Sequence, residues 1–75
     1  MENAELDQLR QAYRNAVEVW IATIRAEEAL ATPDHSVAAV DRWEEAGFRE
    51  EEARNAAKAA KSAYEDALRR VNYNF

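Results

Sequence analysis

Apolar residues in the first thirty positions recur at alternating intervals of three and four. The clearest series is Leu6, Leu9, Tyr13, Ala16 and Trp20. This spacing places the side chains on one face of an α-helix, and the alternation is the heptad pattern of a coiled coil. It predicts a helix from about residue 3 to about residue 31. Asn3 is the expected N-cap, and Glu5 lies near the positive end of the helix dipole.

A second apolar stripe lies beside this series on the same predicted helix. At 100° per residue, the apolar positions between Tyr13 and Ile24 extend from Val19, about 100° to one side of Trp20, to Ile21, about 100° to the other side, an arc of nearly 200°. One partner helix needs an arc of only about 100°. We therefore expect this helix to contact more than one neighbour.

The segment Thr32-Pro33-Asp34-His35-Ser36 interrupts the helical pattern. Pro33 lacks a backbone N–H and disfavours helical geometry at Thr32, which predicts a turn at about residues 32–35. Thr32, Asp34 and Ser36 are alternative N-caps of the next helix. A connection this short makes the two helices antiparallel neighbours.

The second helix is expected from about residue 34 to about residue 72. Its heptad series is Ala53, Ala57, Ala60, Tyr64, Ala67 and Val71. Upstream of this series Gly47 either kinks the helix or ends it as a left-handed cap. We favour a continuous helix, because Glu45–Arg49 and Glu50–Arg54 form i,i+4 pairs across the region.

A turn at Pro33 places each residue of the first helix opposite a definite residue of the second. Trp20 then faces Ala46, and Glu27 lies beside Ala39, so that bulky side chains of one helix meet alanines of the other. The second helix is the longer one. We expect about ten of its residues to project beyond the start of the first helix.

The predicted fold is therefore all-α: a single domain, 1–75, forming a long antiparallel two-helix hairpin that dimerises into a four-helix bundle. The alternative is a monomeric three-helix bundle with a break at Gly47. A lone hairpin leaves a large apolar stripe in water, which is typical of an association surface. The residues that we assign to a dimer or partner interface are Val17, Trp20, Ile21, Ile24, Val37, Val40, Tyr64, Leu68 and Val71.

Composition excludes several classes of function. The 75 residues include no Cys, one His, one Gly and one Pro, so there is no thiol nucleophile, multi-histidine metal site or glycine-rich phosphate loop. No apolar run approaches the roughly 20 residues of a membrane span, and no secretory signal is recognisable. We expect a cytoplasmic protein without cofactor or metal.

Charge is unevenly distributed along the chain. Residues 27–52 carry a net charge of −7 and residues 53–75 a net charge of +3, within a total of −5. The bases could contact nucleic acid at the open end of the hairpin, opposite the turn, although a basic footprint usually belongs to a basic domain. The residues of this alternative are Arg10, Arg14, Arg54, Lys58, Lys61, Arg69 and Arg70.

The remaining polar residues provide no catalytic arrangement. His35 adjoins Ser36 on the turn, but neighbouring residues of a turn do not form a nucleophile–base pair, and no third orienting group is evident. The acidic cluster around Glu44 and Glu51 is typical of a solvated helix face. The sequence therefore predicts a non-enzymatic protein-interaction or structural module. Its partner is most simply a second copy of itself, or else another protein, and no membrane is involved.

Overall fold

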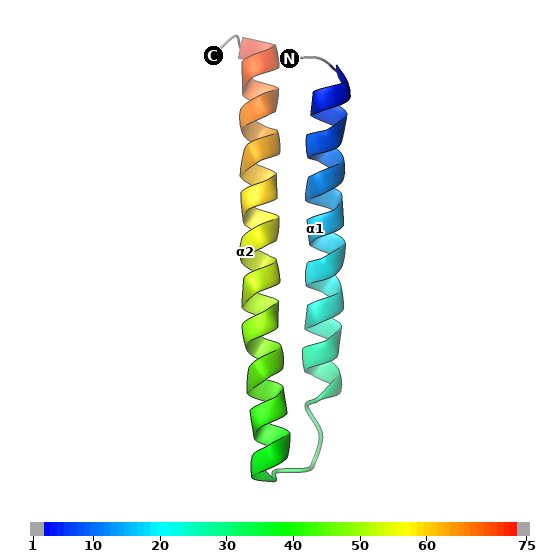
Figure 1. The fold of residues 1–75 in the computed structure, drawn as a ribbon, viewed down its shortest axis with the longest axis vertical. Coiled ribbons are helices and arrows are strands. Elements are labelled where there is room, and N and C mark those ends of the chain that lie inside the picture. Colours follow the sequence, from blue (N-terminus) through cyan, green and yellow to red (C-terminus); the bar gives the residue numbers. More distant parts are fainter. Residues whose placement is uncertain (1–2, 74–75) are drawn as a thin grey trace.

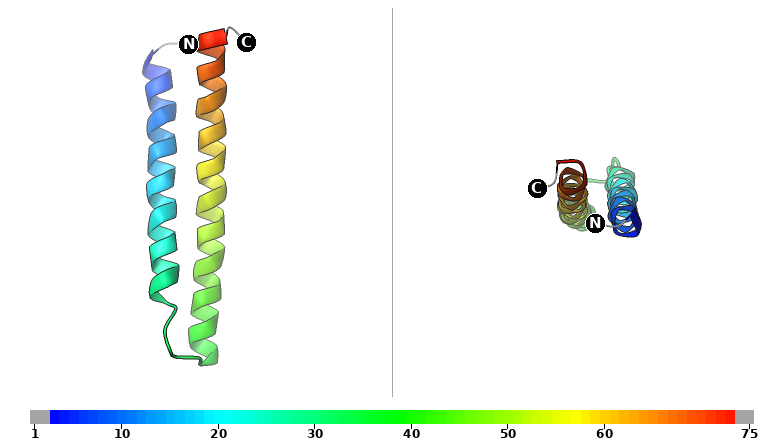
Figure 2. Two further views of the ribbon diagram at one scale, coloured as in Figure 1. Left: turned by 180° about the vertical axis from the view of Figure 1, so that it is seen from behind. Right: turned by 90° about the horizontal axis from the view of Figure 1, so that it is seen from above.

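The structure is a computed structural model and describes residues 3–73 of the chain. Two α-helices, α1 (Asn3–Ala29) and α2 (Val37–Tyr73), run antiparallel along their whole shared length (Figure 1, Figure 2). The Cα atoms span 56 × 17 × 12 Å. Within residues 3–73 there is no strand. The predicted all-helical hairpin is confirmed.

The connection between the helices is longer than the sequence predicted. α1 ends at Ala29, two residues before the expected boundary, and residues 30–36 form an irregular loop in place of a turn at 32–35. The Leu30 N–H donates to the Glu27 carbonyl at 3.1 Å, and the Ala31 N–H donates to the Glu28 carbonyl at 3.0 Å. These i to i−3 bonds tighten the last turn and satisfy carbonyls that the α-helical pattern leaves free.

α2 begins at Val37, later than the predicted start near residue 34, because Asp34 and Ser36 build a local turn first. Asp34 Oδ1 accepts the Ser36 N–H at 2.9 Å, and Ser36 Oγ accepts the Ala39 N–H at 3.2 Å. Of the three N-caps considered, Ser36 is therefore the one used. Thr32 Oγ1 instead accepts the Asp34 N–H at 3.3 Å within the loop.

α2 passes through Gly47 without interruption, as favoured from the i,i+4 pairs. Arg49 and Glu45 approach to 3.8 Å, and Arg54 and Glu50 to 3.4 Å. Gly47 does not adopt the left-handed backbone conformation that a C-terminal cap requires. The predicted alternative of a three-helix bundle broken at this residue is wrong.

The start of α1 and the end of α2 differ in part from the prediction, and in part lie outside the described residues. Asn3 lies inside α1, so it is not the N-cap, and the cap position falls outside the described residues. Glu5 does lie in the first turn of α1, and Arg70 lies in the last turn of α2. Tyr73, just beyond the predicted end of the second helix, is still helical, and residues 74–75 lie outside the described part.

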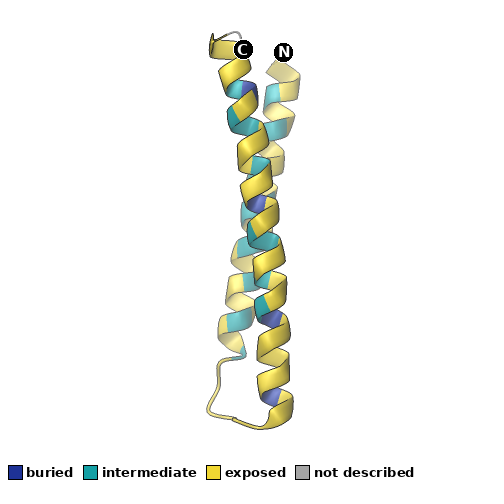
Figure 3. Cartoon of the chain, turned by 90° about the vertical axis from the view of Figure 1, so that its left-hand side faces the viewer, coloured by how far each residue is buried: buried dark blue, intermediate teal, exposed yellow. Residues whose placement is uncertain are grey.

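The core is a thin strip between the helices, and the residues in it are small. The buried residues among those described are all alanines of α2: Ala39, Ala46, Ala57 and Ala67 (Figure 3). The facing positions of α1 are only half-buried and keep the predicted intervals of three and four. They are Leu6, Leu9, Tyr13, Ala16, Trp20, Thr23 and Glu27. Bulky side chains of α1 therefore pack over alanines of α2, as predicted.

The register between the helices differs from the one derived from a turn centred at Pro33. Trp20 contacts Glu50 where Ala46 was expected, and Glu27 lies beside Gly47 where Ala39 was expected. The observed partners lie four and eight residues further along α2 than the expected ones. This displacement corresponds to one or two steps of the heptad series. Because seam positions recur every three or four residues, such a shift keeps nearly the same faces in contact, and the heptad spacing could not distinguish the two registers.

The predicted projection of α2 beyond the start of α1 is also wrong. Ala67, which was to lie on the projecting segment, is 1% exposed, and its neighbours Tyr64 and Leu68 are half-buried. α2 instead extends beyond α1 at the loop end of the hairpin (Figure 1, Figure 2). The loop continues past the end of α1 alongside this extension before the chain enters α2, and this accounts for the altered register (Figure 1).

Candidate association surface

One long side of the hairpin carries apolar and charged side chains from both helices, and we call it the Val17 face. At 100° per residue, Val17, Ile21 and Ile24 of α1 lie beside the contact seam on this side. From α2 the same face receives Val40, Glu44, Gly47, Glu51, Lys58, Lys61 and Leu68. A groove of about 230 Å³ in it is lined by Tyr13, Val17, Trp20, Ala57, Lys58 and Lys61. The groove shows that Val17 and the two lysines lie on one side of the molecule.

Apolar exposure extends along most of this face. Among the predicted interface residues, Val17, Trp20, Tyr64 and Leu68 are half-buried by the hairpin itself. The other predicted interface residues are exposed: Ile21, Ile24 and Val40, which lie on this face, and Val37 and Val71, which are not part of it. Val37, at the start of α2, is 78% exposed.

Several exposed apolar residues were not among those assigned to the interface. Trp43 is 46% exposed, because the observed register places it towards the loop end, where it lines a groove with Leu30. Val19, Phe48 and Tyr73 are more than half exposed and lie away from the Val17 face by helical phase. Val19 belongs to the wide apolar arc of the first helix, whereas the isolated positions of Phe48 and Tyr73 gave no signal of association.

A polar cluster interrupts the apolar seam near the middle of the hairpin. The Trp20 Nε1–H donates to Glu50 Oε2 at 2.7 Å, and the Arg54 Nε lies 3.4 Å from the same oxygen. The Glu50 side chain is 19% exposed, so the indole hydrogen bond and the charge of the guanidinium stabilise a largely covered carboxylate. The Arg54 Nε atom itself is buried without a hydrogen-bond partner. The predicted pairing of Glu50 with Arg54 is confirmed.

Glu27 is the less satisfied of the two glutamates on the seam. Its Oε2 is buried without a hydrogen-bond partner. A Cβ added at Gly47 would lie 3.8 Å from that oxygen. Glycine at position 47 therefore leaves room beside the Glu27 carboxylate without supplying a donor to it.

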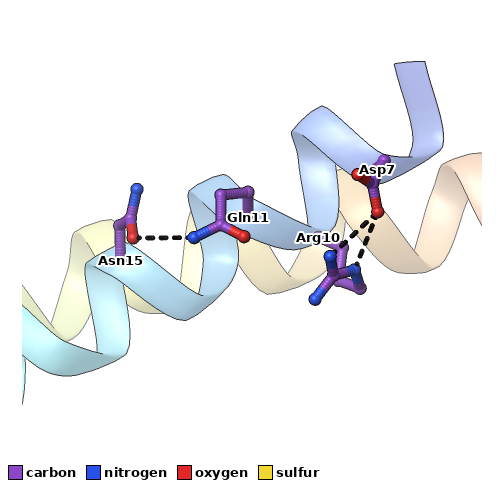
Figure 4. A network of polar contacts seen from close by, with 4 residues as sticks. All are labelled: Asp7, Arg10, Gln11 and Asn15. Carbon is purple, nitrogen blue, oxygen red and sulfur yellow. Dashed lines mark hydrogen bonds and ion pairs between the residues drawn. The ribbon is translucent and has the colours of Figure 1, made fainter. Parts of the chain in front are cut away.

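Most of the arginines considered for nucleic-acid contact are engaged by acids on their own helix. Arg10 binds Asp7 through two nitrogens at 2.9 and 3.1 Å, next to the Gln11–Asn15 side-chain hydrogen bond (Figure 4). Arg69 lies 3.0 Å from Asp66. Arg14 lies 3.7 Å from Glu18, and Arg54 pairs with Glu50. Lys58, Lys61 and Arg70 form no ion pair with any described residue. The structure does not gather the seven bases into one patch of free cations.

The loop end contains a second groove, of about 240 Å³, that His35 and Asp34 line together with Trp43. Ser36 Oγ is occupied as the cap of α2, and no hydrogen bond joins it to His35 within the described loop. The Ser36 N–H and hydroxyl, which hydrogen-bond to the Asp34 carboxylate, lower the pKa of Asp34 below its usual value. Within residues 3–73, no group of three or more acidic or histidine side chains could hold a metal ion.

Neither helix is long and apolar enough to cross a membrane, as far as residues 3–73 show. No protein-family model, curated protein or solved structure matches the chain.

Proposed function

We propose that the chain is a small, non-enzymatic assembly module, which dimerises through the Val17 face to form a four-helix bundle. One observation supports this most strongly: the described residues buried by the hairpin are alanines, while Ile21, Ile24, Val37 and Val40 stay exposed. Burial of such side chains makes the largest favourable contribution to the free energy of folding and association. The hairpin alone buries little of this apolar surface. The cysteine-free composition favours a cytoplasmic setting.

The area of the molecular surface gives independent support. The chain exposes 5829 Å². A compact monomer of 8.6 kDa exposes about 4,700 Å². The excess is about 1,100 Å² per chain, so two chains could together remove about 2,200 Å² from water, the scale of a stable protein–protein interface.

The proposal is tested by the molar mass in solution. Sedimentation equilibrium at several micromolar concentrations should give twice the chain mass of 8.6 kDa. Ile24→Glu places a charge on the Val17 face and should shift the equilibrium towards monomer. Val19→Glu places the same charge on the same helix but off that face, and should leave the dimer intact. A wild-type chain that stays monomeric at every concentration would contradict the proposal.

Nucleic-acid binding through the basic open end is the second candidate and has less support. Four of its seven bases already contact carboxylates of their own helix. Phosphate recognition depends on free cations and weakens steeply with salt. A titration with mixed RNA at low and high salt should show no salt-sensitive binding if the assembly role is correct.

A further inference from the structure

We infer that the two hairpins of the dimer associate antiparallel through the Val17 face, with the loop end of one against the open end of the other. This inference rests on the proposed dimer and adds its orientation. The placement of charge along the molecule and the ion pairs within one hairpin support this orientation.

The two halves of the hairpin differ in charge. Residues 17–56, which form the half nearer the loop, contain ten acids and four bases, a net charge of −6. Residues 3–16 and 57–73, which form the described part of the open half, contain four acids and six bases, a net charge of +2. A parallel dimer places the two strongly acidic halves side by side. An antiparallel dimer places each of them beside a weakly basic half, which lowers their mutual repulsion.

The same separation of negative and positive charge is present on the Val17 face itself, in side chains that form no ion pair within the hairpin. Lys58 and Lys61 border the groove in the open half, and both are exposed. Glu44 and Glu51 lie on the same side of α2 in the loop half, and both are exposed. None of these four forms an ion pair with a described residue, in contrast to Arg54, Arg10 and their partners.

A two-fold axis perpendicular to the helices brings these unpaired charges together. Lys58 and Glu51 are seven residues apart, about 10 Å along α2, and the middle of that interval lies near the centre of the helix. Rotation about an axis through this region places Lys58 of one hairpin near Glu51 of the other, and Lys61 towards Glu44. Val17 of α1 lies in the same central region, since it lines one groove with Lys58. A parallel arrangement sets lysine level with lysine and glutamate level with glutamate, which disfavours it.

The orientation can be measured with single spin labels, because the chain contains no cysteine of its own. Ala38→Cys labels the start of α2, and Ala56→Cys labels its middle; both alanines are exposed and lie off the Val17 face at the same helical phase. Pulsed dipolar spectroscopy on the Ala56 label should give a distance below about 40 Å in any side-by-side dimer. The Ala38 label should give about 50 Å or more in the antiparallel dimer, since each label lies about 17 residues from the central axis.

The outcomes separate the two proposals. A short distance at both positions would show a parallel dimer and overturn the inference while leaving the proposed function intact. The absence of dipolar coupling at Ala56 would show a monomer and overturn both.

Charge reversal provides a second measurement. The variant Lys58→Glu/Lys61→Glu should weaken dimerisation by about tenfold or more, since it replaces attraction by repulsion on both sides of the two-fold axis. Adding Glu44→Lys/Glu51→Lys to the same chain should restore it. An unchanged dissociation constant for the first variant, or no recovery in the second, would contradict the antiparallel pairing.

Discussion

The indole of Trp20 in α1 donates a 2.7 Å hydrogen bond to the carboxylate of Glu50 in α2. The contact joins residues thirty positions apart and fixes the two helices at one height relative to each other. Its acceptor is charged and largely covered, and hydrogen bonds of this kind are among the stronger ones in proteins.

Trp20→Phe should destabilise the protein by about 1–2 kcal/mol, because Phe keeps most of the packing but leaves the Glu50 oxygen with Arg54 alone. Urea denaturation at a fixed protein concentration measures the change. Trp43→Phe is the matched control, since Trp43 is half exposed, and it should change stability by less than about 0.5 kcal/mol. Equal effects of the two substitutions would show that the Trp20–Glu50 bond contributes no stability.

Gly47→Ala should stabilise the protein by about 0.5–1 kcal/mol, because glycine in a helix interior costs backbone entropy and alanine does not. The backbone at Gly47 is not left-handed, and the new Cβ meets the Glu27 carboxylate at an ordinary contact distance of 3.8 Å. Thermal unfolding followed by circular dichroism gives the change. A loss of stability would indicate that the helix needs the flexibility of glycine here.

Glu27→Leu should also stabilise, by about 1 kcal/mol or more, because it removes a buried carboxylate oxygen that has no hydrogen-bond partner and adds an apolar side chain to the seam. Glu28→Leu, on the neighbouring exposed position, is the control and should have a much smaller effect. If Glu27→Leu lowers the unfolding temperature, then the carboxylate is satisfied by a contact that the hairpin alone does not contain.

Stability should depend on pH through Asp34. Its pKa is lowered in the folded chain by the hydrogen bonds from Ser36, so the folded state favours the charged carboxylate more than the unfolded state does. The resulting stabilisation is fully present above the unfolded pKa of about 3.8 and is lost as the pH falls through the folded pKa. Asp34→Asn keeps a side-chain acceptor for the Ser36 N–H without the charge. It should flatten the pH dependence of unfolding below about pH 4, and an unchanged profile would exclude Asp34 as its source.

The positions that form the core could be predicted from the sequence, because they follow from helical period alone. Leu6, Tyr13 and Trp20 of α1 and the alanines Ala57 and Ala67 of α2 all lie on the seam that the spacing indicated. The alternatives that depended on backbone detail were harder to decide. The cap of α2 is an example, because Thr32, Asp34 and Ser36 all have the right chemistry and only their hydrogen bonds in the loop distinguish them.

The register and the polar cluster could not be predicted in the same way. Ala46 and Glu50 lie on neighbouring positions of the same seam, so they were not distinguishable as partners of Trp20 until the path of the loop was known. The positive charges of Lys58 and Lys61 are evident from the sequence. Whether they are left without an ion pair, and so are available to a partner, depends on which acids the nearby arginines already bind. That information lies in the contacts of the folded chain.

The loop at residues 30–36 lies outside the seam, and residues 31–36 of it are exposed. Its residues add little to the packing, so insertions or deletions there leave the seam intact. The helices are constrained differently, because one added residue rotates everything beyond it by 100°, while a whole heptad restores the phase. Over evolutionary time, such a hairpin can vary freely in loop length, whereas its helices can grow or shrink only in steps of seven.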